Sequence, residues 1–309
     1  MFSRPIRLGI VGLGKIAIDQ HLPAVAKSRD FKLVAGCSLA APEVSFPVHA
    51  DFDDMLRRHP EIEAVSICTP PTARAALALR AIVAGRHVFL EKPPAATLGE
   101  AETLRDAAVK ARVSLFASWH SRYAAAVERA RLWLADRTIR SVTIHWKENI
   151  RQWHPGQKWI MQAGGMGVFD PGINALSILT HLMPGRVVVA GADLHVPGNC
   201  QAPIQAELDM RSGDIAIRAE FDFLQADVQT WEMLIVTDRG VLKLSRGGAQ
   251  LDIDGAMVLK GTDVEYAGLY SQFARLIRAK KSDADFEPLR IVADATLIGR
   301  PHVAPDYIE

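Results

Sequence analysis

The stretch that decides the fold is RLGIVGLGKIA, residues 7–17. A short run of strand character leads into a glycine-rich turn, and a helical pattern follows. Gly12, Gly14 and Ala17 match G-x-G-x-x-G/A, the fingerprint of dinucleotide binding. Gly12 permits the tight turn, Gly14 lets a pyrophosphate approach the backbone, and Ala17 lets the helix pack closely on the strand. The strand–turn–helix context therefore predicts a dinucleotide site at this turn.

The composition is that of an ordinary soluble protein, with 309 residues, 49% hydrophobic and 23% charged. The length suggests two domains. A formal net charge of +1 disfavours a nucleic-acid surface, and no apolar stretch is long enough to span a bilayer. The chain opens without a signal-peptide pattern. Cys37, Cys68 and Cys200 have no metal-like spacing, so we expect reduced thiols, no metal and a cytoplasmic location.

The first third of the chain alternates strand and helix patterns. The expected strands after the first are Phe31–Cys37, Ala64–Ile67, His87–Leu90 and Ser114–Ala117. The expected helices are Lys15–Lys27, with a kink at Pro23, Asp51–Arg58, a helix capped by Thr72 that runs to Ala84, and Leu98–Ala111. This α/β alternation predicts a doubly wound parallel sheet, a Rossmann domain over residues 1–121.

Beyond residue 121 the pattern changes to helices mixed with strand-like runs. Turn signals such as Ser212-Gly213-Asp214 and Asp254-Gly255 separate these runs. We expect an α+β domain over residues 122–309 with a large, mostly antiparallel open sheet. One face of such a sheet is free to cover a pocket or a partner. We therefore assign substrate binding and oligomerisation to this domain, and we expect a homodimer by default. A second arrangement left open by the sequence is that the final helices pack back on the first domain.

Ligands of a parallel sheet lie outside the carboxyl ends of its strands, and several polar residues fall at such ends. The expected dinucleotide-binding residues are Gly12, Gly14, Lys15, Ile16, Ser38, Thr69, Pro70, Glu91 and Lys92. NAD enzymes place an acid about 20 residues past the glycines, and Ser38 stands there instead. A serine tolerates a 2′-phosphate, but Leu39 and Ala40 add no positive charge. We expect NAD(P), with NADP favoured over NAD.

Lys92 and Asp170 are the candidates for chemistry. Lys92 follows a strand end, where a cation can polarise a substrate oxygen, although a solvated surface lysine is the ordinary alternative. Asp170 precedes a helix expected from Pro171, so it is either an N-cap or a general base. Asn174 lies four residues on, and its amide can orient a hydroxyl but cannot titrate. We assign the base role to Asp170, with Lys92 as a possible relay.

Three motifs resemble those of the Gfo/Idh/MocA oxidoreductases, the glucose–fructose oxidoreductase and inositol dehydrogenase family. They are GLGKIA at residues 12–17, EKP at residues 91–93 and GGMGVFDPGIN at residues 164–174. The family's third motif normally reads D-x-G-x-H, and here its last residue is Asn174. That departure, together with WHSR at residues 119–122 and WKE at residues 146–148, resembles the bacterial aldose 1-dehydrogenases more narrowly.

The resemblance implies hydride transfer from the anomeric carbon of L-arabinose or D-galactose to nicotinamide, giving an aldonolactone. The residues expected to bind the aldopyranose are His120, Glu148, Trp153, His154, Asp170, Asn174 and Trp231. Each histidine or tryptophan among them has an alternative interpretation as a core residue. Two other functions stay open at this point, namely an inositol- or polyol-type dehydrogenase and a non-catalytic sugar-sensing regulator.

Overall fold

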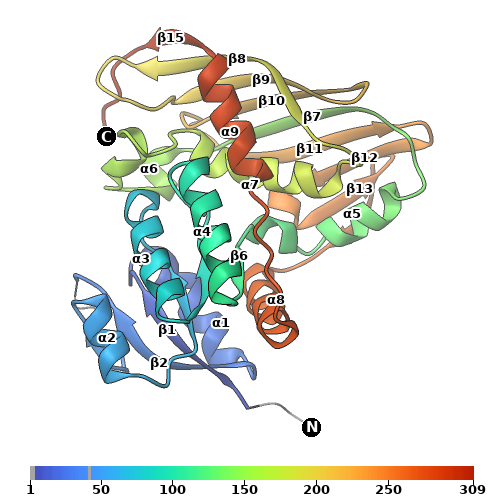
Figure 1. Ribbon diagram of the computed structural model, residues 1–309. Helices are drawn as coiled ribbons and strands as arrows, with labels where there is room; N and C mark the ends of the chain where they lie inside the picture. The colour runs from blue at the N-terminus through green and yellow to red at the C-terminus, as the bar shows by residue number, and fades with distance from the viewer. Residues whose placement is uncertain (1–3, 41–42) are drawn as a thin grey trace. The chain divides into compact units, whose positions relative to one another are not determined.

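The computed structural model describes residues 4–40 and 43–309 (Figure 1). Residues 1–3, which belong to the start inspected for a signal sequence, lie outside the described residues. The chain forms two compact units. The first unit comprises Met1–Trp119 and Tyr266–Phe286, and the second comprises His120–Glu265 and Glu287–Glu309. Neither unit is therefore one continuous piece of the chain.

The first unit contains a six-stranded parallel sheet in the order β3-β2-β1-β4-β5-β6, which confirms the expected doubly wound fold. The strand order reverses between β1 and β4, the usual place for a dinucleotide. The strands are β1 (Ile6–Val11), β2 (Phe31–Cys37), β3 (Val48–His49), β4 (Ala64–Ile67), β5 (His87–Leu90) and β6 (Leu115–Ala117). The short β3 was not expected from the sequence.

Helices accompany this sheet in the alternation that the sequence predicts. They are the π-helix η1 (Ala17–His21), α1 (Leu22–Lys27), α2 (Phe52–Arg58), α3 (Pro71–Val83), α4 (Leu98–Ala111) and, from late in the chain, α8 (Glu265–Ala279). After α8 the chain reaches the edge of β6, where Asp283 accepts a backbone hydrogen bond from Ala117 and donates one to Leu115. The late segment thus covers the β6 edge of the first sheet.

Two local features of these helices differ from expectation. The helix over residues 15–27 is present, but its middle is a π-turn in which Leu22 N–H donates to the oxygen of Ala17. Because Pro23 lacks an N–H and crowds the carbonyl four residues earlier, a wider turn suits it. The predicted cap of α3 is wrong. The N-cap of α3 is Pro70 and Pro71 starts the helix, so Thr72 lies inside it.

The second unit contains a nine-stranded sheet in the order β14-β13-β12-β11-β7-β10-β9-β8-β15. Two pairs, β7 with β10 and β8 with β15, are parallel, and the others are antiparallel. The strands are β7 (Ile139–Lys147), β8 (Val188–Pro197), β9 (Gln205–Ser212), β10 (Ile215–Asp222), β11 (Thr230–Thr237), β12 (Gly240–Ser245), β13 (Gln250–Ile253), β14 (Ala256–Lys260) and β15 (Arg300–Ala304). The edge strands β14 and β15 were not expected, because their mostly exposed side chains lack an alternating apolar pattern.

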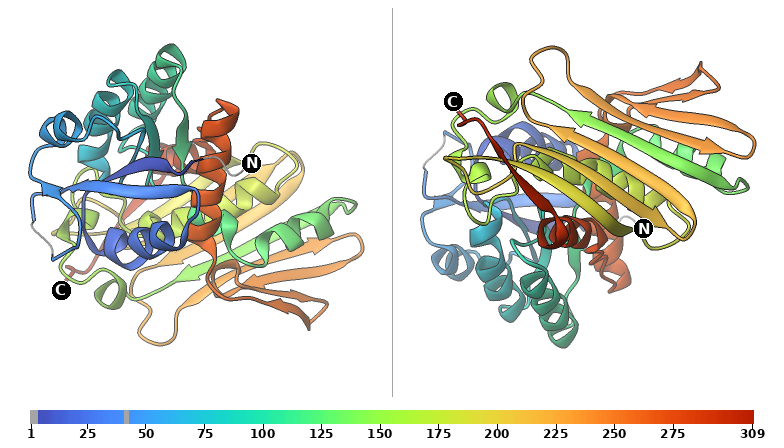
Figure 2. Two further views of the ribbon diagram at one scale, coloured as in Figure 1. Left: turned by 90° about the horizontal axis from the view of Figure 1, so that it is seen from below. Right: turned by 90° about the horizontal axis from the view of Figure 1, so that it is seen from above.

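Helices cover one face of this second sheet. They are η2 (His120–Tyr123), α5 (Val127–Leu134), α6 (Ile150–Trp153), η3 (Lys158–Met161), α7 (Phe169–Leu182), η4 (Arg246–Gly248) and α9 (Glu287–Ile298). The other face is open, and the yellow and orange strands carry no helix in front of them in the right-hand view of Figure 2. The burial of β9 alternates accordingly between buried and exposed residues. The homodimer predicted for this face stays a prediction.

The close contact of α7 with the sheet is set by one glycine. A Cβ at Gly172 would lie 2.9 Å from the ring of Phe221, and the rings of Phe169 and Phe221 lie 5.8 Å apart at an angle of 67°. The helix is therefore held against β10 at the turn that follows Asp170. Only a residue without a side chain permits this approach.

We expect Gly172→Ala to lower the free energy of unfolding by about 1–3 kcal/mol, because the added methyl group overpacks the contact with Phe221. The matched control is Gly99→Ala in α4, where an added Cβ meets nothing within 4 Å. That control should leave stability unchanged or raise it by up to about 1 kcal/mol, since alanine restricts the unfolded chain. Urea unfolding of both variants measures the difference, and equal stabilities would contradict this account of the α7 contact.

Candidate functional site

The glycine-rich turn has the geometry that a dinucleotide requires. Gly12 has φ of +86°, and a Cβ there would lie 2.8 Å from the backbone nitrogen of Thr69. Gly14 faces open space, with nothing within 4 Å of the position of a Cβ. Ala17 is fully buried. The turn is thus closed on the side of β4 and open at Gly14, where a pyrophosphate can reach the backbone, so the residues present fit the cofactor.

The end of β2 lies beside this turn. Gly12 N–H donates to the oxygen of Cys37 at 2.8 Å, and Ser38 N–H donates to the oxygen of His49 at 2.9 Å. Ser38 is half-buried, and neither Leu39 nor any other residue from 38 to 40 is acidic. The ribose end of a dinucleotide bound at this edge would therefore face a hydroxyl rather than a carboxylate.

The positive charges near this end of the sheet are compensated. Lys15 is exposed and forms an ion pair with Asp19. Arg80 forms an ion pair with Asp53. Burial raises the pKa of the Cys37 thiol, and the Arg80 cation lowers it in part. Both cations therefore have a carboxylate partner, which reduces the charge that either offers to a phosphate.

The loop that carries Lys92 is fixed from two sides. Arg74, a buried residue of α3, donates to the backbone oxygen of Glu91 at 2.6 Å and to those of Pro93 and Thr69. The carboxylate of Glu91 in turn accepts the backbone N–H of Lys92 at 2.8 Å. The half-buried Lys92 thus starts from a rigid backbone. Sequence reasoning missed Arg74, although an arginine on the apolar side of an alanine-rich helix is an unusual feature.

Asp170 is not a helix N-cap, which corrects the alternative considered from the sequence. The helix α7 begins at Phe169 and its N-cap is Val168, which makes no side-chain hydrogen bond, so Asp170 is in the first helical turn. The helix begins before Pro171 because a proline is favourable in a first turn, where no N–H is needed. Asp170 is buried, with 4% of its surface exposed. A buried carboxylate near a helix N-terminus is stabilised by the helix dipole.

His154 lies between two carboxylates of the second unit. Its Nε2 atom is 3.5 Å from Oε1 of Glu148 and 3.7 Å from Oδ2 of Asp170. Its Nδ1 atom is buried and, within the described part of the chain, has no hydrogen-bond partner. The tautomer that places the proton on Nε2 suits this arrangement, because that proton then faces the carboxylates. We call these three residues the carboxylate–imidazole cluster.

Tryptophan side chains flank the cluster. The indole N–H of Trp231 donates to Oε2 of Glu148 at 2.8 Å. The ring of Trp231 lies 5.3 Å from that of Trp153 and 6.1 Å from that of Trp146. Trp153 is 37% exposed although it is large and apolar. The structure thus brings Glu148, Trp153, His154, Asp170 and Trp231 together as connected neighbours.

The two remaining expected residues have different surroundings. Asn174 is the only half-buried residue in the otherwise buried stretch of α7 from Phe169 to Leu179, one turn after Asp170. Asn174 is therefore partly exposed where its neighbours along the helix are buried. His120 lies on η2, where it pairs with Glu265 and lies 3.3 Å from the hydroxyl of Ser121. The role of His120 in sugar binding stays a prediction.

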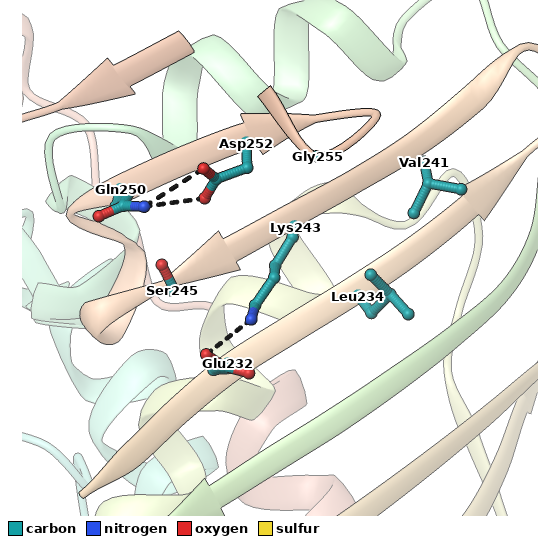
Figure 3. A pocket seen from close by; sticks show the side chains of 8 residues that line it. All are labelled: Glu232, Leu234, Val241, Lys243, Ser245, Gln250, Asp252 and Gly255. Carbon is teal, nitrogen blue, oxygen red and sulfur yellow. Dashed lines mark hydrogen bonds and ion pairs between the residues drawn. The ribbon is translucent and has the colours of Figure 1, made fainter. Parts of the chain in front are cut away.

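A separate hollow of about 440 Å³ lies on the open face of the second sheet (Figure 3). In it, Lys243 pairs with Glu232 at 2.8 Å, and Gln250 donates to Asp252 at 3.0 Å. The hollow contains no member of the carboxylate–imidazole cluster, and its charged side chains have partners within the hollow itself. We therefore do not regard it as the reaction site.

The described residues lack two features, a membrane-spanning helix and a metal-binding cluster. No helix within residues 4–40 and 43–309 combines the length and apolar character needed to cross a membrane. The same residues contain no group of three or more His, Cys, Asp or Glu side chains placed to hold a metal ion.

Comparison with known proteins relates the chain to a family of oxidoreductases. Residues 6–118 match the oxidoreductase family described as having an NAD-binding Rossmann fold, GFO_IDH_MocA. The chain is 46% identical to galactose 1-dehydrogenase of Pseudomonas fluorescens over 297 residues, which cover 96% of each protein. The chain belongs to the Gfo/Idh/MocA oxidoreductase family, and it is an enzyme of the oxidoreductase class.

Solved structures show the same relationship. A D-galactose-1-dehydrogenase from Rhizobium etli superposes with a TM-score of 0.95 at 50% identity, covering 100% of this chain and 99% of the other. A 3-ketoreductase from Actinomadura kijaniata, in complex with NADP and TDP-benzene, has a TM-score of 0.86 at 18% identity and covers 98% of this chain and 100% of its own. The latter likeness concerns the fold alone.

Proposed function

We propose that this protein is an NAD(P)-dependent aldose 1-dehydrogenase, which oxidises the anomeric carbon of D-galactose, L-arabinose or both to the aldonolactone. The observation that carries the proposal is the carboxylate–imidazole cluster of Glu148, His154 and Asp170 beside exposed tryptophan surface. The relatives named galactose 1-dehydrogenase support the choice of sugar. The two sugars share their ring hydroxyl pattern and differ in an exocyclic CH₂OH group.

The cluster suits a pyranose because a sugar ring needs directional partners on its edge and apolar surface on its faces. Glu148 and Asp170 accept hydrogen bonds, whereas His154 donates through Nε2. The half-buried Asn174 adds an amide that both donates and accepts. Trp153 offers an apolar ring for the C–H face of the sugar. A set of this kind discriminates hydroxyl positions better than it senses one extra CH₂OH group.

We assign the base role to Asp170. In the oxidation the C1–H bond breaks as hydride, the hydroxyl O–H bond breaks as a proton, and a C1=O bond forms. When bound, the dinucleotide supplies the hydride acceptor. Asp170 takes the proton, and the Nε2–H group of His154, whose nitrogen lies 3.7 Å from Oδ2, is placed to donate a hydrogen bond to that carboxylate after a small adjustment. Asn174 orients the hydroxyl but does not exchange protons at neutral pH.

Lys92 supplies positive charge to the reacting oxygen in this proposal. Its backbone is held by Glu91, and that loop is held by Arg74, so the side chain starts from a defined position. A preorganised cation lowers the energy of developing negative charge without reorganising during the reaction. Lys92 and Asp170 therefore divide the work into charge stabilisation and proton removal.

The direct test of the proposed function is a sugar panel assayed with NAD and with NADP by absorbance of the reduced nicotinamide. We expect turnover with D-galactose and L-arabinose, and a lactone as the first product, detected by NMR or by trapping with hydroxylamine. Turnover of myo-inositol without turnover of any aldopyranose would overturn the assignment.

For the cofactor, we propose use of NAD(P) with NADP favoured, because Ser38 occupies the place of the usual acid. Ser38→Asp should lower kcat/KM with NADP far more than with NAD, since the new carboxylate repels the 2′-phosphate at short range. Ser38→Asn, which adds no charge, is the control. A preference ratio that does not move toward NAD in the Asp variant would show that Ser38 is not at the ribose.

For the base, Asp170→Asn should lower kcat by roughly 10²–10⁴, the usual worth of general acid–base catalysis. The loss of rate at acid pH in the wild type, caused by protonation of the base, should be absent from the variant. Asp209→Asn makes the same change at an exposed residue of β9, and it should leave both kcat and the loss of rate at acid pH unchanged. A near-normal kcat with an unaltered acid limb in Asp170→Asn would remove Asp170 from the proton path.

A further inference from the structure

A second buried network, in the first unit, surrounds Glu91. Its Oε1 atom accepts the hydroxyl of Tyr266 at 2.7 Å and lies 2.9 Å from Nε2 of His21. Its Oε2 atom accepts the backbone N–H of Lys92 at 2.8 Å. Glu91 is 2% exposed and His21 is fully buried. The carboxylate is therefore surrounded by donors on both oxygens, which is what a buried ionised group requires.

The network continues from His21 to the core of the sheet. Nδ1 of His21 lies 2.8 Å from the hydroxyl of Tyr270, which lies 3.0 Å from the hydroxyl of Ser66 on β4. Burial raises the pKa of the Tyr270 hydroxyl well above its ordinary value, so that it stays protonated and can donate. Tyr270 and Ser66 thus hold the imidazole of His21 in one orientation.

The residues of this network come from segments far apart in the sequence. His21 lies on the π-turn that follows the glycine-rich turn, and Glu91 follows β5. Tyr266 and Tyr270 stand one turn apart on α8, which packs on β2 through contacts such as the 5.4 Å approach of the Tyr270 ring to Phe31. The late helix α8 thereby contributes the hydroxyl of Tyr266 to the loop that carries Lys92, and the hydroxyl of Tyr270 to His21.

Stability alone does not account for such a network. Replacing buried hydrogen-bonded partners by apolar side chains of the same shape is often nearly neutral or stabilising, because the desolvation of the polar groups is avoided. Buried polar networks instead specify one arrangement of the groups around them. Here the group so specified is the backbone N–H of Lys92, which Glu91 holds directly.

We propose that His21 and Tyr266 are positioning residues, which act through Glu91 to place Lys92 for hydride transfer. The inference rests on the proposed function for its effect on turnover, but not for its effect on the loop. Neither residue is assigned contact with the sugar. The arrangement predicts that a change at α8, late in the chain, alters the rate of chemistry at Lys92.

The experiment compares four variants of the full chain saturated with NADP. Tyr266→Phe deletes one oxygen and keeps the ring, and His21→Leu removes both ring nitrogens. His21→Gln keeps a donor for Oε1 of Glu91 and serves as the conservative rescue. Ser66→Ala removes a hydroxyl at the far end of the network, where among the described residues its hydrogen-bond partner is the hydroxyl of Tyr270 and not Glu91. Amide hydrogen exchange of Lys92 and steady-state kinetics with D-galactose are measured for each.

We expect Tyr266→Phe and His21→Leu to speed exchange at the Lys92 amide about tenfold or more, because Glu91 loses a donor that orients it. They should lower kcat by roughly 10-fold to 100-fold, the effect of a small misplacement of a catalytic group. The KM for the dinucleotide should stay within about twofold, since the glycine-rich turn is untouched. His21→Gln and Ser66→Ala should stay within about threefold of the wild type in kcat, as the bond to Glu91 persists.

Two results would overturn the proposal. One is unchanged exchange at Lys92 in Tyr266→Phe, and the other is faster exchange with an unchanged kcat, which would leave the network a purely structural element. If His21→Leu does not fold, the exchange rate and kcat of Tyr266→Phe still decide whether the network positions Lys92. A wild-type enzyme that oxidises no sugar of the panel would instead refute the proposed function, and the exchange measurement would then still decide whether the network positions Lys92.

Discussion

A carboxylate that leaves water stays charged only where donors replace its hydration, and this constraint shapes both units of the protein. Glu91 follows strand β5, and its carboxylate accepts a hydrogen bond from the hydroxyl of Tyr266 and contacts the imidazole of His21. Glu148 follows strand β7, and its carboxylate accepts a hydrogen bond from the indole N–H of Trp231 and lies near the imidazole of His154. In each unit the donors are aromatic residues of another segment. The need to satisfy the acid therefore specifies which segments must meet at the end of the strand.

The two glutamates differ in what they hold. Glu91 is enclosed by protein donors and holds a backbone N–H, so its surroundings favour a fixed loop. Glu148 has a partner in Trp231 on one oxygen, whereas the other faces His154 at the longer distance of 3.5 Å. The 3.5 Å separation from His154 is longer than a hydrogen bond, so this oxygen of Glu148 is held less tightly than those of Glu91. The first arrangement suits positioning and the second suits recognition.

Asn174 stands where the family's third motif normally has a histidine, and the second unit shows which side chains surround the neighbouring Asp170. An asparagine there cannot act as an acid or a base, but an imidazole is still present close to Asp170, because His154 arrives from the loop after α6. Spacing along α7 could not reveal this, because His154 lies outside that helix and is separated from Asp170 by a segment that contains η3. The family motif alone therefore describes the amide but not the imidazole that lies near Asp170.

The regular elements of the first unit were predictable because their causes are local. Alternating runs of strand and helix character predicted β2, β4, β5 and α4 at the bounds that the structure shows. The capping box of α4, formed by Thr97 and Glu100, is of the same local kind. The error at Thr72 also has a local cause, because the proline before it starts α3 without a cap. Edge strands were missed because their exposed side chains carry no periodic pattern.

By itself, the sequence determined the dinucleotide fold, the oxidoreductase family and the candidate residues, since a glycine turn, a strand end and a motif are each contained in a few adjacent positions. Only the tertiary structure decided that Arg74 holds three carbonyl groups, that His154 lies between two acids, and that α8 supplies Tyr266 to Glu91. These contacts join residues up to 175 positions apart. No local pattern encodes such a pairing, because it depends on how the sheets and helices pack to remove apolar surface from water.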